Sequence, residues 1–306
     1  MRLEVVRRFD PWRSPLCTCP PKYSLQPYTG CSHYCLYCYA TAYIGRRRST
    51  PKKRLMERLR RDLRKLPPDS LVELSTSSDP YPPLEARLGL TRRCLRAIAA
   101  AGHRILVTTK GSLVARDSDI LSRARAAVMI TITTMDEGLA SKLEPGAPPP
   151  AERIRALKTL HDAGVPVGVR LDPLLPGLND DADSVRDVLE AAKSAGAETV
   201  TCSTYKARPD NLRRVLEAFP ELEERYRRMY VREGVWMHGY WYLQAEARRR
   251  ILEAVREVAV RLGLGFATCR EGFNTMNTAG SCDGSHLIRG RNTIGKNRAR
   301  RLDEWV

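Results

Sequence analysis

Short apolar runs alternate with longer amphipathic stretches through the middle of this chain, and that alternation restricts the fold more than any other feature. The runs typical of strands cover residues 23–28, 71–75, 104–108, 127–132, 166–171 and 199–202. The stretches with helical spacing that follow the later runs cover residues 91–101, 115–126, 151–163 and 183–195. Units of this kind build parallel sheets that are buried on both faces. We therefore predict an α/β fold, a partial (β/α)6 barrel of the TIM type, since a closed barrel needs about eight strands.

The chain outside this pattern divides into a leader and a C-terminal extension. Residues 1–22 contain four prolines and little regular pattern, so we place the barrel at residues 23–206. Residues 207–306 are expected to form a C-terminal helical and loop extension with a basic tail. Its parts are charged helices over 211–219 and 221–229, an amphipathic helix over 244–262, a coil-like stretch over 265–285 and the basic residues of 289–301.

Three cysteines, Cys31, Cys35 and Cys38, fall within eight residues of one another. Thiolates this close repel one another unless a metal neutralises their charge. A structural zinc ion prefers four ligands, so three thiolates in one loop suit a [4Fe–4S] cube whose fourth iron stays open to another ligand. The alternative is a zinc knuckle completed by a distant cysteine or by His33.

Four further cysteines lie toward the two ends of the chain. Cys17 and Cys19 form a CxC pair in the proline-broken leader, whereas Cys269 and Cys282 lie in the coil-like stretch near the C-terminus. Together they would supply a tetrahedral set of thiolates for zinc or for a second iron–sulfur cluster. Otherwise they are unpaired thiols in loops.

Several polar side chains follow the predicted strands directly. Because the carboxyl ends of parallel barrel strands meet at one mouth, these side chains are expected to converge there. They are Ser75, Ser77, Ser78, Lys110, Thr131 and Thr133. Cys202 ends the last predicted strand, where it would donate a hydrogen atom or contact a substrate; packing in the core is the alternative.

The net charge of +17 over 306 residues comes mostly from arginine. Such a charge favours polyanionic partners such as nucleic acid, although an arginine-biased composition gives the same sum without a partner. Arg46, Arg47 and Arg48 beside the cysteine loop are candidates for substrate contact, and the aromatic run 236–242 would either stack on a nucleobase or anchor on the barrel. No apolar run is long enough to span a membrane and no signal-peptide core begins the chain, so we expect a cytoplasmic protein.

The spacing CxxxCxxC, with the aromatic Tyr37 directly before the last cysteine, resembles the signature of the radical S-adenosylmethionine (SAM) enzymes. The wider run from Tyr28 to Ala40 is similar to the spore photoproduct lyase-related branch, whose members are also called DNA repair photolyases. The resemblance implies a [4Fe–4S] cluster whose open iron binds the amino and carboxylate groups of SAM. It also implies that an electron, from a ferredoxin- or flavodoxin-like reductant, splits SAM into methionine and a 5′-deoxyadenosyl radical.

The same resemblance implies that the strand-end residues bind SAM. In the pattern of the branch, the positions of Ser78 and Lys110 contact SAM, and Lys110 can pair with its carboxylate. Tyr37 and the other strand-end hydroxyls are then expected in the same cofactor site, with ordinary capping of strand ends as the alternative for any single one. One position departs from the pattern: spore photoproduct lyase has a hydrogen-donating cysteine where this chain has Thr76, whose O–H bond is too strong to donate a hydrogen atom easily.

The leading hypothesis is a radical SAM enzyme, a lyase or a modification enzyme, that abstracts a hydrogen atom from a nucleic acid or from a protein bound to one. A second hypothesis keeps the radical chemistry and assigns a small-molecule or peptide substrate. A third is a nucleic-acid-binding protein whose iron–sulfur or zinc centres are structural or redox-sensing. The strand-end hydroxyls and Lys110 argue against the third, because a binding module has no need of a methionine-shaped pocket.

Overall fold

The computed structural model describes residues 3–9 and 16–290 of the chain. Its centre is one eight-stranded sheet in which seven strands run parallel and one edge strand, β1, runs antiparallel to its neighbour. In their order across the sheet the strands are β1 (Val6–Arg8), β2 (Tyr23–Leu25), β5 (Leu71–Leu74), β6 (Arg104–Thr109), β7 (Ala126–Thr131), β8 (Val167–Leu174), β9 (Thr199–Thr204) and β12 (Gly265–Thr268). The predicted partial (β/α) barrel is confirmed.

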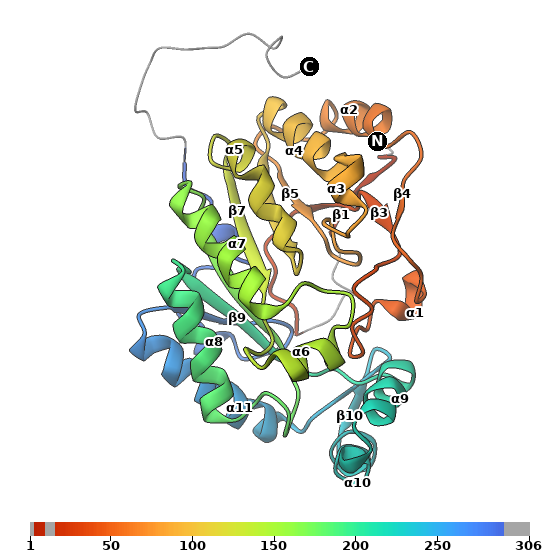
Figure 1. The fold of residues 1–306 in the computed structure, drawn as a ribbon, viewed down its shortest axis with the longest axis vertical. Coiled ribbons are helices and arrows are strands. Elements are labelled where there is room, and N and C mark those ends of the chain that lie inside the picture. The colour runs from red at the N-terminus through yellow and green to blue at the C-terminus, as the bar shows by residue number, and fades with distance from the viewer. Residues whose placement is uncertain (1–2, 10–15, 291–306) are drawn as a thin grey trace.

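The longer helices α2 (Leu55–Leu63), α4 (Leu90–Ala100), α7 (Pro150–Asp162), α8 (Ala182–Ser194) and α11 (Ala245–Arg261) cover the outer face of this sheet (Figure 1). A further long helix, α9 (Pro209–Ala218), packs instead with the loop that carries Cys35 and with Tyr226. The shorter ones are α1 (Thr41–Ile44), α3 (Glu85–Leu88), α5 (Ser118–Leu121), α6 (Glu137–Leu143) and α10 (Glu223–Tyr226), and two small hairpins pair β3 (Tyr28–Thr29) with β4 (Thr50–Pro51) and β10 (Val235–Met237) with β11 (Tyr240–Tyr242). No helix of the described residues is long and apolar enough to cross a membrane.

The alternation of side chains along each strand divides the core into two parts. On β6, Ile105 and Val107 pack with helix residues such as Leu95 in the large outer core. Leu106, between them, packs on the opposite face, in a smaller cluster with Met129 of β7 and Leu287 near the C-terminal end of the described chain. The strands are therefore apolar on both faces, as the continuous apolar runs of the sequence predicted.

The two ends of the chain contribute more regular structure than their sequences indicate. The leader, expected to be irregular, supplies β1. The backbone N–H groups of Val5, just before β1, and of Val6 in it donate to the buried carboxylate of Asp62 on α2, at 2.8 and 3.0 Å. The stretch 265–285, expected to be coil, begins with β12, which pairs in parallel with β9. Both strands have only three or four residues, and Gly265 opens β12, so neither produces a recognisable period of two.

Two other local predictions need correction. The helix expected over 115–126 is a 3-10 turn over Ser112–Asp117 followed by the single turn of α5, and β7 already begins at Ala126. The aromatic run 236–242 forms the β10–β11 hairpin, in which Tyr242 is buried whereas Trp236 is 53% exposed. Trp241 of this hairpin pairs through its backbone with Ala207, three residues after the end of β9, so the run is anchored on the barrel.

The segment around Gly284 and Leu287 closes the inner face of the sheet. Gly284 has φ +87°, and a Cβ added there would lie 2.3 Å from the sulfur of Met129, so only glycine permits this close approach. Leu287 is 7% exposed and packs against Leu71, Leu106 and Met129. The basic tail predicted over 289–301 lies almost wholly outside the described residues.

We expect Leu287→Ala to lower the free energy of unfolding by about 2–4 kcal/mol, because it removes a buried leucine from the inner core. The measurement is urea denaturation followed by circular dichroism. Val260 on α11 is 51% exposed, so Val260→Ala serves as the control and should change the free energy by less than about 0.5 kcal/mol. Equal, small effects of both substitutions would show that the C-terminal segment does not pack inside the barrel.

Candidate active site

A cavity of about 540 Å³ opens at the carboxyl ends of the parallel strands, as the rule for barrel enzymes predicts. Each central strand delivers polar side chains to it. They include Ser75, Ser77, Ser78 and Asp79 after β5, Thr109 and Lys110 at the end of β6, Thr131 on β7, Arg170 and Asp172 on β8, and Ser203 and Lys206 at the end of β9. The cavity therefore combines a polar wall with several buried charges.

The loop that carries Cys31, Cys35 and Cys38 forms another side of the same cavity, and all three cysteines line it. Neighbouring elements fix the backbone of this loop. Arg214 on α9 donates to the carbonyl oxygens of Leu36 and Cys38, both at 3.0 Å, and Asn211 donates to the carbonyl of Tyr37 at 3.0 Å. The three thiols are thus presented from a backbone held by other elements before any ligand binds.

Gly30 makes the entry into this loop possible. The Cys31 N–H donates to the carbonyl of Arg47 at 2.9 Å, which brings two chain segments into contact at Gly30. A Cβ at Gly30, whose φ is +75°, would lie 2.5 Å from the carbonyl oxygen of Arg48. The same contact places Arg46, Arg47 and Arg48 directly beside the cysteine loop.

Asp79 ties the functional loops together. One carboxylate oxygen accepts from the Tyr81 N–H at 2.8 Å and from the Thr109 hydroxyl at 2.6 Å. The other accepts from the Lys110 N–H at 2.8 Å and lies 3.4 Å from Nδ1 of His33 in the cysteine loop. Burial would raise the pKa of this carboxyl, but the neighbouring His33 ring and the hydrogen bonds outweigh burial and lower the pKa to about 2.

The carboxylate of Glu144 forms a second group of ion pairs and hydrogen bonds behind the cavity wall. It is 1% exposed and pairs with Arg153 at 2.5 Å and more distantly with the Lys110 amine at 3.9 Å. The Thr133 hydroxyl donates to it at 3.0 Å, and so does the Tyr37 hydroxyl. Burial raises and the two cations lower the pKa of Glu144, with a net shift downward, so the carboxylate stays ionised and orients Tyr37 and Lys110.

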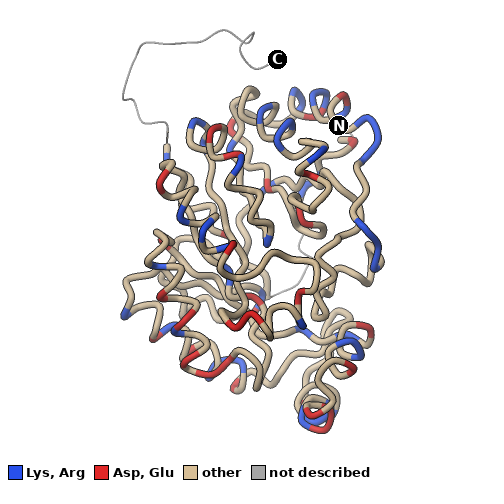
Figure 2. The backbone as a smooth tube through the Cα atoms, viewed as in Figure 1, with Lys and Arg blue, Asp and Glu red and all other residues tan. Residues whose placement is uncertain are grey.

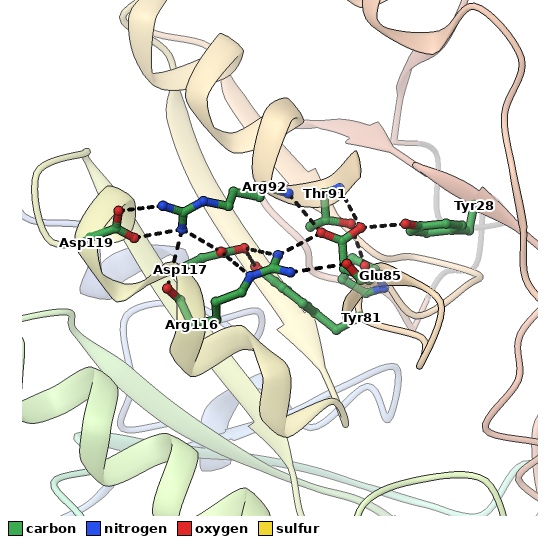
Figure 3. A network of polar contacts seen from close by, with 9 residues as sticks. Tyr28, Tyr81, Glu85, Thr91, Arg92, Arg116, Asp117 and Asp119 are labelled. Carbon is green, nitrogen blue, oxygen red and sulfur yellow. Dashed lines mark hydrogen bonds and ion pairs between the residues drawn. The ribbon is translucent and has the colours of Figure 1, made fainter. Parts of the chain in front are cut away.

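A third polar network holds the segments that flank the site (Figure 3). Glu85 accepts from the Tyr28 hydroxyl, shortly before the cysteine loop, and from Arg116 at 2.8 Å. Asp117 accepts from the Tyr81 hydroxyl at 3.0 Å, shortly after Asp79. Both carboxylates are fully buried. They fix the entry to the cysteine loop and the exit from the serine-rich loop, residues 75–81, to the same helical layer.

The structure brings most of the predicted site residues together, and it separates two of them from the cavity. Those on the cavity wall are Cys31, Cys35, Cys38, Tyr37, Ser75, Ser77, Ser78, Lys110, Thr131 and the four thiols Cys17, Cys19, Cys269 and Cys282. Thr133 bonds Glu144 instead, and Cys202 is fully buried in the outer core, with its sulfur 3.8 Å from the carbonyl of Ala267. Side chains alternate between the two faces of β9, so Cys202 points into the outer core while the next residue, Ser203, faces the cavity.

Several charged residues on the wall were missed by the sequence analysis. Arg170 pairs with Asp172 at 2.5 Å, and Asp172 also accepts from the Ser203 hydroxyl at 2.5 Å. Lys206 pairs with the buried Glu271 at 3.0 Å. Arg170 is a charged residue between the apolar Val169 and Leu171 of a predicted strand, and this position could have indicated its role in the sequence.

Comparison with known proteins turns this arrangement into a family assignment. The model of the Radical SAM superfamily matches residues 25–191, which is more than half of the chain. The chain belongs to the radical SAM superfamily, and it is an enzyme of that class. The superfamily match includes the three-cysteine loop, the serine-rich loop and Lys110.

The chain also has relatives in sequence and solved structures with a similar fold. The uncharacterized protein Rv2578c of Mycobacterium tuberculosis is 30% identical over 234 residues, which cover 70% of this chain and 68% of the relative. Spore photoproduct lyase complexed with dinucleoside spore photoproduct has the same fold, with a TM-score of 0.64 at 17% identity over 80% of this chain and 75% of that one. SuiB of Streptococcus suis bound to the precursor peptide SuiA is similar with a TM-score of 0.54 at 15% identity, over 80% of this chain and 48% of that one.

The donor set on the cavity wall fits the cofactors that the radical SAM superfamily implies. Cys31, Cys35 and Cys38 all line the cavity, and a cube binds each thiolate through a different iron. Three thiols would therefore hold three irons and leave the fourth open to a ligand in the cavity, whereas a structural zinc ion needs a fourth protein ligand.

We expect Asp79→Asn to lower the free energy of unfolding by about 2 kcal/mol near neutral pH. A carboxyl whose folded pKa is about 2, against an ordinary 3.8, stabilises the fold fully above its ordinary pKa and loses that effect as pH falls through about 2. The difference between wild type and variant, measured by urea denaturation, should therefore shrink between about pH 4 and pH 2. A difference that stays constant over this range would contradict the assignment, and the exposed Asp162→Asn is the control with an effect below about 0.5 kcal/mol.

Proposed function

We propose that this chain holds a [4Fe–4S] cluster with Cys31, Cys35 and Cys38 and cleaves SAM there to start a radical reaction on a nucleic acid or on a protein bound to one. One observation carries the proposal: the three thiols, the hydroxyls after β5 and Lys110 face a single cavity. When bound, the cluster and SAM together supply, on one-electron reduction, a 5′-deoxyadenosyl radical able to abstract a hydrogen atom. We propose a ferredoxin- or flavodoxin-like protein as the electron donor.

The residues of the chain would bind and orient the cofactor. The Lys110 side chain is 15% exposed, and its amine lies over the Tyr37 ring, 5.4 Å from the ring centroid, and 3.9 Å from Glu144. This position leaves a buried cation available to a carboxylate in the cavity, where low exposure strengthens the attraction. Ser75, Ser77, Ser78 and Thr131 add hydroxyl groups that can donate to or accept from the polar groups of the amino acid part of SAM.

Exposed cations beside the cavity favour a polyanionic substrate. Arg46, Arg47 and Arg48 are all exposed and adjoin the cysteine loop, and Arg7, Arg8 and Lys52 line the cavity itself. Figure 2 shows Lys and Arg on the chain on both sides of β4, near the right edge of the view. Clustered cations of this kind bind phosphates and release their counterions.

Thr76 distinguishes this proposal from the repair reaction of spore photoproduct lyase. Thr76 lines the cavity, and its hydroxyl accepts a hydrogen bond from the Gln26 side chain at 2.7 Å. A thiol at this position could return a hydrogen atom to a product radical, whereas a threonine hydroxyl holds its hydrogen too strongly. We therefore propose hydrogen abstraction without assigning the reversal of a thymine lesion.

Ser78→Ala and Lys110→Ala should each reduce SAM cleavage at least about 100-fold, since each removes a proposed contact to the methionine part of SAM. The assay reconstitutes the protein with iron and sulfide without oxygen, adds dithionite and SAM, and quantifies 5′-deoxyadenosine. Iron content should stay that of the wild type in both variants, and Cys35→Ala should lose both iron and cleavage. Lys158→Ala, at an exposed ion pair on α7, is the matched control. Wild-type cleavage in both Ser78→Ala and Lys110→Ala would overturn the pocket assignment.

Replacing Arg46, Arg47 and Arg48 with alanine should weaken binding to a DNA oligonucleotide and lower the slope of log affinity against log salt by about 2–3. The control replaces Arg186, Arg249 and Arg250 on α8 and α11, which are exposed and change the net charge equally. Fluorescence anisotropy over a salt series measures both. An equal loss of DNA affinity in the two triple variants would show that only the net charge matters and not the position of the arginines. That result would favour the peptide or small-molecule substrate.

A further inference from the structure

Four thiols from the two ends of the chain meet on the wall of the same cavity. Cys17 and Cys19 come from the leader, and Cys269 and Cys282 come from the segment after β12, yet all four line the cavity that also contains the three-cysteine loop. We propose that these four thiols bind a second, thiolate-ligated metal centre, either zinc or an iron–sulfur cluster. The proposal concerns metal binding alone, so it does not depend on SAM cleavage.

The spacing of the sulfur atoms supports a shared site. The sulfur atoms of Cys19 and Cys282 lie 3.7 Å apart, and Cys17, two residues before Cys19, lines the same cavity. Two thiolates at about 2.3 Å from one tetrahedral ion stand about 3.8 Å apart, which matches the Cys19–Cys282 separation. The geometry thus places one pair of sulfurs at the spacing of two ligands on the same metal atom.

Buried contacts assemble the site from distant segments. The Lys22 amine, three residues after Cys19, pairs with Asp283 at 2.7 Å and with Glu73 on β5 at 2.7 Å. All three side chains are almost fully buried, and Asp283 directly follows Cys282. A salt bridge between residues 261 positions apart therefore holds the leader and the C-terminal segment together beside the thiols.

Cys269 is positioned by the barrel itself. It follows the last residue of β12, and its N–H donates to the carbonyl of Cys202 on β9 at 2.9 Å, which continues the parallel ladder by one residue. Arg170 on β8 lies near its thiol. Lys22 and Arg170 are cations close to these thiols, and each also pairs with a carboxylate, Asp283 and Asp172 respectively.

The four thiols do not yet surround one point, since no group of three metal-binding side chains among the described residues does so. A single zinc ion would hold all four sulfurs at about 2.3 Å from one point. A two-iron cluster would bind two thiolates on each iron, so Cys19 and Cys282 would share one iron and Cys17 and Cys269 the other. Metal and sulfide counts separate these two occupants.

The test uses the full chain with Cys31, Cys35 and Cys38 all replaced by alanine, so that the first cluster is absent. After anaerobic supply of iron, sulfide and zinc, this variant should retain metal, which adding Cys19→Ser and Cys282→Ser should remove. Adding Cys94→Ala and Cys202→Ala instead, at two fully buried thiols, is the matched control and should leave the metal in place. Iron with sulfide identifies a cluster, and zinc without sulfide identifies a zinc site.

Alkylation by iodoacetamide followed by peptide mass spectrometry gives a second readout on unmutated protein. Cys17, Cys19, Cys269 and Cys282 should resist alkylation in the metal-loaded protein and react after chelation. The proposal is overturned if the variant lacking the first cluster binds no metal and all four thiols react at once, or if they are recovered as a Cys19–Cys282 disulfide. If the unmutated protein does not cleave SAM but still binds metal at these four thiols, only the proposed function is overturned.

Discussion

The site depends on one buried carboxylate. Asp79 accepts hydrogen bonds from the serine-rich loop and from the end of β6, and it lies beside His33 in the cysteine loop. These three segments are far apart in sequence, and each carries part of the proposed cofactor site. A charged group in this position is stable only because donors surround it, so the cysteine loop, Ser78 and Lys110 keep their places relative to one another.

The other buried charges repeat this arrangement at increasing distance from the cavity. Glu144 holds Tyr37 and Lys110 from behind, while Glu85 and Asp117 hold Tyr28 and Tyr81 on the outer layer (Figure 3). Each carboxylate accepts hydrogen bonds from elements that are far apart in the sequence. The cavity can therefore be polar and still rigid, which suits a reaction that must control a reactive radical and exclude water.

Sequence patterns predicted the parts of the structure that have a regular period or a specific spacing. Apolar runs predicted the central strands, and CxxxCxxC predicted the family, because both patterns lie in adjacent residues. The patterns missed β1 and β12, since strands of three or four residues have no recognisable period. They also missed Arg170 as part of the cavity wall, because its role depends on Asp172 and on the approach of Cys269, which only the fold brings near. For Cys202 the sequence left both the mouth and the core open, and strand alternation turns it to the core and turns Ser203 to the cavity.

The pairing of Lys22 with Asp283 has a consequence for how the molecule is made. These residues are 261 positions apart, and the ion pair that they form borders the cavity. Contacts over such separations form late in folding, because the entropy of closing a long loop must first be overcome. During synthesis the chain emerges from its N-terminus, so the leader and the cysteine loop are exposed well before β12 and Asp283 exist. The cavity is complete only when the chain has been made through Asp283, and until then its thiols are exposed to the surrounding solution.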